Sequence, residues 1–137
     1  KAIRRQRQMC IRDRYNIIVI DDHKMLREMI SETLNTRGFN VIASSGDAKD
    51  SVPLCEKFKP DLILMDIQMP FMNGYETCKE IRKMKDTQKA NIPIIAMTAN
   101  AFAEDIQKVL SVGMNAHVAK PVDMNILVPT MMKYLKE

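Results

Sequence analysis

The sequence predicts one α/β domain built on a five-stranded parallel sheet with helices on both faces. Five short apolar runs alternate along the chain with segments of helical periodicity, which is typical of parallel sheets with right-handed crossovers. Four of these runs end directly on polar residues, and 137 residues suffice for one hydrophobic core. We therefore expect a single doubly wound sheet with five helices, whose site lies where the strands end.

The five predicted strands are short apolar segments bounded by turn residues. The run over residues 62–65 is too short for a buried helix and indicates a strand covered on both faces. It ends on Asp66, and Pro70 then marks a turn. A helix should begin at Asn73 as N-cap, because Glu76 follows three residues later. The predicted strands span residues 16–20, 39–43, 62–65, 94–97 and 116–119.

Helices are predicted from the spacing of apolar residues and from the residues at helix ends. Gly38 and Gly113 should follow the C-terminal ends of the first and fourth helices, and the last should begin near Asp123. Pro53 fits only the first turn of a short second helix, whereas Pro129 should kink the last helix or split off its first turn. The lining residues are expected to be Leu26, Met29, Ile30, Thr33 and Leu34; Val52, Cys55 and Phe58; Tyr75, Cys78 and Ile81; Ile106, Val109 and Leu110; and Leu127, Met131 and Tyr134.

Composition and charge exclude several classes of protein. Six of the 21 basic but only one of the 17 acidic side chains lie in residues 1–14, so residues 15–137 carry 15 basic and 16 acidic side chains. This near-neutral body lacks the basic surface of a nucleic-acid-binding domain, and no apolar run approaches the roughly 18 residues of a membrane span. Three scattered cysteines indicate neither a disulfide framework nor a zinc site. We expect a cytoplasmic domain that itself contacts neither nucleic acid nor membrane.

Residues 1–14 are expected to lie outside the folded domain. They show neither helical nor strand periodicity, and no apolar segment follows their basic residues as a signal peptide requires. We predict a disordered or non-native tail, with a basic nucleic-acid-binding arm as the alternative. The folded domain is placed at residues 15–137.

Polar residues follow four of the predicted strands. Asp21 and Asp22 follow the first, Asp66 the third, Thr98 the fourth and Lys120 the fifth, so all five should meet at one edge of the sheet. Three adjacent carboxylates repel one another unless a cation lies among them, and oxygen ligands alone suit Mg²⁺. Lys120 adds a positive charge and Thr98 a hydroxyl donor. This set of groups suits transfer of a phosphoryl group to Asp66.

Across residues 15–137 the sequence resembles the receiver domain of response regulators in bacterial two-component systems. Each matching motif is common on its own, whereas all five in this order and at these spacings are highly specific. The resemblance implies a flavodoxin-like fold with the strand order 2-1-3-4-5. The matching motifs are Asp21-Asp22, Asp66, Met69-Pro70 with Gly74, Thr98-Ala99 and Lys120-Pro121.

The resemblance also implies a chemistry. A histidine kinase or a histidine phosphotransfer domain would transfer a phosphoryl group from a phosphohistidine to Asp66, with Mg²⁺ as cofactor. The domain would catalyse this transfer and its own slow dephosphorylation. The implied Mg²⁺ ligands are Asp21, Asp22, Asp66 and the backbone carbonyl of Gln68; the implied phosphate-binding residues are Thr98, Ala99 and Lys120, with a cis peptide bond before Pro121.

Four residues are candidates for switching or for setting the lifetime of the phosphoryl group. Thr98 would move toward the phosphate, and His117 stands where most receivers carry an aromatic ring that moves inward with that hydroxyl. The alternative is that His117 is only an exposed residue of an edge strand. Gln68 and Asn100 should flank the path of water to the phosphorus, and neither is a carboxylate able to act as a strong general base.

Other functions are weighed against this one. A haloacid-dehalogenase-type phosphohydrolase also uses a strand-end aspartate with Mg²⁺, but it requires a second aspartate where this chain has Gln68. A receiver-like module that binds partners without being phosphorylated usually lacks some of the acids or the lysine. Dinucleotide binding would require a Gly-x-Gly-x-x-Gly motif after the first strand. His23 and His117 lack partners at metal-ligand spacing, so structural roles are expected for both.

The segment over residues 92–105 most resembles receivers at the C-terminus of hybrid sensor histidine kinases. Because the chain lacks an initiator methionine and ends just after the last predicted helix, we expect it to be a piece of such a kinase. A stand-alone receiver is the alternative.

Overall fold

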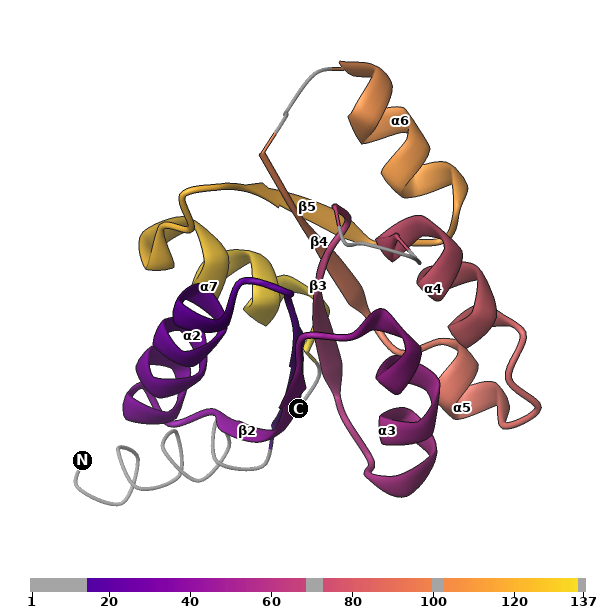
Figure 1. Cartoon of the computed structure of the whole chain (residues 1–137), viewed down its shortest axis with the longest axis horizontal. Helices are drawn as coiled ribbons and strands as arrows, with labels where there is room; N and C mark the ends of the chain where they lie inside the picture. Colours follow the sequence, from indigo (N-terminus) through magenta and orange to yellow (C-terminus); the bar gives the residue numbers. More distant parts are fainter. Residues whose placement is uncertain (1–14, 69–72, 100–102, 136–137) are drawn as a thin grey trace.

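The structure, a computed structural model, describes residues 15–68, 73–99 and 103–135. Five strands form one parallel sheet in the order β2-β1-β3-β4-β5, as expected (Figure 1). The tail over residues 1–14, the motif residues Met69 and Pro70, and Asn100 lie outside the described residues. The strands are β1 (Asn16–Ile20), β2 (Asn40–Ser45), β3 (Leu62–Asp66), β4 (Ile94–Thr98) and β5 (Ala116–Ala119).

Helices cover both faces of the sheet (Figure 1). In the described part of the chain they are α2 (Lys24–Thr36), α3 (Ser51–Lys57), α4 (Gly74–Arg82), α5 (Thr87–Ala90), α6 (Ala103–Ser111) and α7 (Met124–Tyr134), with a 3₁₀ turn at Ala48–Asp50. Five helices were expected, and α5 is the additional one. This single turn is capped by the Asp86 side chain and is too short to show helical periodicity.

Two apolar layers enclose the sheet, because successive strand residues point to opposite faces. On one face, Ile17 and Val19 of β1 pack with residues of α2 and α7; on the other, Ile18 and Ile20 pack with residues of α3, α4 and α6. The central strand β3 is buried over its whole length. The sheet thus forms a core that is covered on both faces.

The ends of the helices follow the expected signals. Gly38 and Gly113 adopt φ values of 97° and 102° just after α2 and α6, a backbone region that favours glycine. Asn73 Oδ1 accepts a hydrogen bond from the Glu76 N–H at 2.9 Å, and Asp123 caps α7. None of the described helices is both long and apolar enough to span a membrane.

Three local expectations are wrong, and a fourth is wrong in one of its two alternatives. Met29 and Leu110 were expected to line helices, but they are 50% and 56% exposed, because each lies about 100° around its helix from a buried neighbour. Pro129 lies inside α7, which runs from Met124 to Tyr134, so the first turn of the helix is not split off; a kink at Pro129 stays a prediction. The second strand covers Asn40–Ser45 instead of residues 39–43, and Ser45 accepts a hydrogen bond from the Asp21 N–H.

Candidate functional site

The carboxyl edge of the sheet brings together the ends of four neighbouring strands. Asp21 follows β1, Asp66 ends β3, Thr98 ends β4 and Lys120 follows β5. Because β3 pairs with both β1 and β4, and β4 pairs with β5, Asp66 lies between the other groups. The Lys120 N–H donates to the Thr98 carbonyl at 2.8 Å, which fixes the lysine beside the end of β4.

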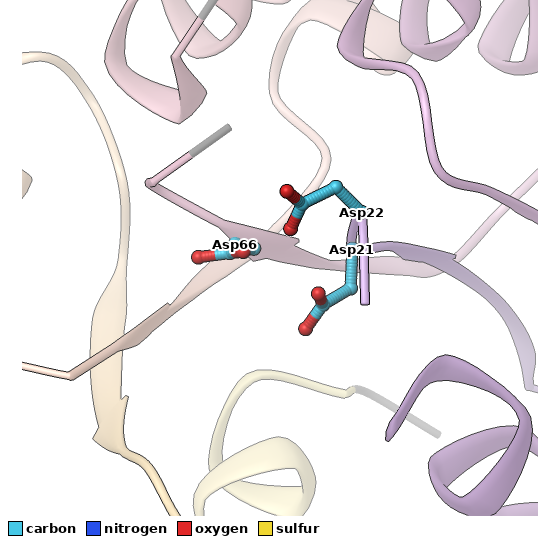
Figure 2. Close-up of side chains that lie close together, drawn as sticks. All are labelled: Asp21, Asp22 and Asp66. Carbon is cyan, nitrogen blue, oxygen red and sulfur yellow. The ribbon is translucent and has the colours of Figure 1, made fainter. Parts of the chain in front are cut away.

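Three carboxylates converge at this edge. Oxygens of Asp21, Asp22 and Asp66 all lie within 4.8 Å of one another, and Figure 2 shows their side chains gathered where β1 and β3 end. Asp21 and Asp66 are buried, whereas Asp22 is exposed. The cluster is therefore open to solvent on the Asp22 side.

Lys120 neutralises part of this negative charge. Its Nζ lies 3.1 Å from Asp21 Oδ2 and 3.2 Å from Asp66 Oδ2, and its side chain is only 20% exposed. Burial alone disfavours the ammonium, but the proximity of Asp21 and Asp66 outweighs it and raises the pKa of Lys120. The lysine is thus a fixed cation against both buried acids.

The environment of Asp66 disfavours its charged form. Burial, and then the charge of Asp21, raise the pKa of Asp66 to about 6, against the opposing effects of the Gln68 backbone N–H and of Lys120. That N–H donates to Asp66 Oδ1 at 3.0 Å. Asp66 is ionised at neutral pH only at a cost in stability.

We expect Asp66→Asn to stabilise the metal-free protein at pH 7 by about 1–3 kcal/mol. Folded Asp66 takes up its proton near pH 6, whereas its ordinary pKa is 3.8. The free energy of unfolding should therefore fall as the pH rises from about 4 to about 6, and this decline should be smaller in the variant. Urea unfolding with a chelator measures both effects. The exposed Asp22→Asn variant is the control and should gain less; loss of stability in Asp66→Asn contradicts the expectation.

The carboxylate cluster fits a divalent cation. Asp21 Oδ2 is buried and, among the described residues, has no partner other than Lys120. Asp22 and Asp66 add carboxylate oxygens within 4.8 Å, and carboxylate oxygens are ligands that Mg²⁺ prefers in proteins. Gln68, two residues after Asp66, is exposed, and its backbone carbonyl stays a predicted ligand.

Gly74 lets α4 approach the end of β3. A Cβ atom at this position would lie 2.8 Å from the Asp66 carbonyl oxygen and 2.8 Å from Ile67 Cα. Both atoms belong to the backbone, so a side chain here would displace the strand end itself. The presence of glycine at residue 74, one of the motif residues, therefore has a steric explanation.

The remaining predicted residues lie at or near this edge. Thr98 is buried and Ala99, which follows it, is exposed. The Lys120–Pro121 peptide bond is cis, the isomer that the resemblance implies. His117 is half-buried on β5, opposite Ala96 of β4. His23 caps α2 by accepting the Leu26 N–H at 3.1 Å, which is a structural role as expected.

Comparison with known proteins identifies the family. The family model for the response regulator receiver domain matches residues 17–131. The chain belongs to the response regulator receiver family. This assignment replaces the dehalogenase alternative, and receivers of this family typically bind Mg²⁺ at their acidic site.

The similar sequences include receivers within sensor kinases. The receiver is 33% identical over 118 residues to the sensor histidine kinase RcsC of Salmonella typhimurium and 37% identical over 116 residues to histidine kinase 1 of Arabidopsis thaliana. These matches cover 86% and 85% of this chain but only 12% and 8% of the kinases. The chain thus spans about a tenth of the length of these relatives.

Solved structures agree with the fold. The chemotaxis protein CheY4 of Vibrio cholerae has a TM-score of 0.81 and 28% identity, with 88% of this chain and 98% of that one covered. The receiver domain of sensor histidine kinase PA1611 from Pseudomonas aeruginosa has a TM-score of 0.77 and 31% identity, with 88% and 96% covered. That structure has a magnesium ion coordinated in its active-site cleft.

Proposed function

We propose that this receiver, comprising residues 15–137, accepts a phosphoryl group on Asp66 from a phosphohistidine, with Mg²⁺ as cofactor. The observation that carries the proposal is the arrangement around Asp66: two further carboxylates within 4.8 Å and the Lys120 ammonium at 3.2 Å. The similarity to receivers of sensor histidine kinases supports a histidine kinase or a histidine phosphotransfer domain as donor, and a place in a hybrid kinase.

The proposed reaction is an in-line displacement at phosphorus. A carboxylate oxygen of Asp66 attacks, a P–O bond forms, and the P–N bond breaks as the electron pair returns to the donor imidazole. Asp21, Asp22, Asp66 and the Gln68 carbonyl would hold Mg²⁺, which offsets the charge developing on the phosphoryl oxygens. Lys120, already fixed against Asp66, would bind one of these oxygens.

Two further groups would bind the product. The Thr98 hydroxyl and the Ala99 backbone would receive the other phosphoryl oxygens, since Thr98 is the last residue of the neighbouring strand β4 and Ala99 follows it. His117 on the adjacent strand would follow the movement of Thr98. Its half-buried ring is compatible both with this switch and with a passive place on an edge strand.

Uptake of phosphoryl groups from a small phosphodonor such as acetyl phosphate tests the proposal. We expect uptake that requires Mg²⁺ and is lost in the presence of a chelator. The proposal is contradicted if the protein takes up no phosphoryl group in the presence of Mg²⁺ and acetyl phosphate although circular dichroism shows that it is folded.

Gln68→Ala is expected to change the rate of loss of the phosphoryl group without abolishing uptake. Gln68 is exposed in the loop after Asp66, and an amide is no strong general base, so the change should stay within about tenfold. Decay of the phosphorylated protein after removal of the donor measures this rate. Gln107→Ala, an exposed glutamine on α6, is the matched control. If Gln68→Ala and Asn100→Ala both decay like the unmutated protein, neither residue tunes the reaction.

A further inference from the structure

Asp21 is held by contacts from three elements of the fold. Its N–H donates to the Ser45 carbonyl of β2 at 3.0 Å, and its Oδ1 accepts the His23 N–H at 2.8 Å. Its backbone carbonyl accepts a hydrogen bond from Arg27 Nη1 at 2.8 Å. Its Oδ2 faces Lys120 at 3.1 Å and accepts no hydrogen bond from the described residues, so this oxygen is available to a metal ion.

Arg27 reaches Asp21 from the first turns of α2. The side chain is half-buried, and the helix backbone fixes its base, because its N–H donates to the His23 carbonyl and its own carbonyl accepts the Ser31 hydroxyl. A guanidinium donating to a carbonyl forms a charge-assisted hydrogen bond, stronger than a neutral one. Arg27 thus ties the start of α2 to the backbone of a proposed metal ligand.

The guanidinium occupies space that a side chain at residue 46 would fill. A Cβ atom on Gly46 would lie 2.6 Å from Arg27 Nη1 and 3.6 Å from the Asp21 carbonyl oxygen. The φ angle of Gly46 lies outside the left-handed region, so the backbone here can accommodate alanine without strain. The steric conflict of an alanine would be with the Arg27 side chain. A methyl group at residue 46 would therefore displace the end of the Arg27 side chain from its present position.

We propose that Arg27 and Gly46 form a positioning pair for the acidic pocket. Arg27, placed over Gly46, fixes the orientation of Asp21 through its carbonyl and so sets the affinity of the pocket for Mg²⁺. This inference rests on the proposed Mg²⁺ site. Residues that orient metal ligands typically contribute about 10- to 100-fold to metal affinity.

A double-mutant cycle on Mg²⁺ affinity tests the pair. We expect Arg27→Ala and Gly46→Ala each to weaken Mg²⁺ binding about tenfold, measured by calorimetric titration. The double variant should bind no more weakly than Arg27→Ala, because the methyl group at residue 46 then has no guanidinium to displace. Arg27→Lys should restore part of the affinity, and Arg37→Ala at the other end of α2 controls for loss of charge.

Urea unfolding of the metal-free variants separates positioning from stability. The inference is overturned if Arg27→Ala or Gly46→Ala lowers the free energy of unfolding but binds Mg²⁺ with an affinity within twofold of that of the unmutated protein. Additive weakening in the double variant overturns the pairing. If the unmutated protein itself binds no Mg²⁺ at millimolar concentrations, the proposed function fails and the inference fails with it.

Discussion

Lys120→Ala is expected to destabilise the metal-free protein by about 3 kcal/mol and to impair phosphoryl uptake. The ammonium lies between Asp21 and Asp66, at 3.1 and 3.2 Å from their oxygens. Its removal leaves two buried carboxylates facing each other without a cation. The pKa of Asp66, already about 6, should rise further, so less of the nucleophilic carboxylate exists at neutral pH.

Mg²⁺ should recover part of the stability lost in Lys120→Ala, because a dication can replace the missing positive charge. Urea unfolding with and without Mg²⁺, together with phosphoryl uptake, measures the effect. Lys133→Ala, an exposed lysine on α7, serves as the matched control and should behave like the unmutated protein. Unchanged stability of Lys120→Ala in the absence of metal would show that the lysine does not compensate the buried acids.

Arg82→Ala is expected to lower the free energy of unfolding by about 3 kcal/mol or more. The guanidinium donates five hydrogen bonds, to the carbonyls of Ala90, Ile92 and Gly113 and to Asn115 Oδ1, at 2.7–3.0 Å. Burial lowers the pKa of Arg82, but a guanidinium stays protonated in proteins. Truncation removes the guanidinium donors from the carbonyls of Ala90, Ile92 and Gly113, whereas Asn115 Oδ1 keeps the Ile94 N–H at 2.9 Å.

Arg82→Lys should rescue little of this loss, because one ammonium cannot reproduce the planar set of five donors. Lys83→Ala is the control: its side chain is 72% exposed and its ion pair with Glu80 spans 3.6 Å, so well under 1 kcal/mol is expected. Urea unfolding measures all three variants. A loss in Arg82→Ala no larger than in Lys83→Ala contradicts the network's role in stability.

The strand ends could be predicted from the sequence because each signal is local. A short apolar run followed by an acid, a threonine or a lysine locates both the strand and the polar group, and parallel strands bring these groups to one edge. Asp66 and Lys120 therefore meet as expected. Gly38 and Asn73 mark helix ends through backbone conformation and side-chain capping, which are also local properties.

Contacts that depend on the tertiary structure could not be predicted in this way. The Arg27–Gly46 contact joins α2 to the residue that follows β2, and no local pattern in the sequence relates these two segments. The hydrogen bonds of Arg82 go to backbone carbonyls, which carry no residue identity. Met29 has the spacing of a buried residue, but its exposure is decided by how α2 lies on the sheet.

The most direct test of the account is to locate the phosphoryl group. After incubation with Mg²⁺ and acetyl phosphate, intact mass spectrometry should show one added phosphoryl group on the unmutated protein and none on Asp66→Asn. Peptide mapping after reductive trapping of the acyl phosphate should assign the group to Asp66. Uptake that persists in Asp66→Asn, or that maps to another residue, would contradict the central claim.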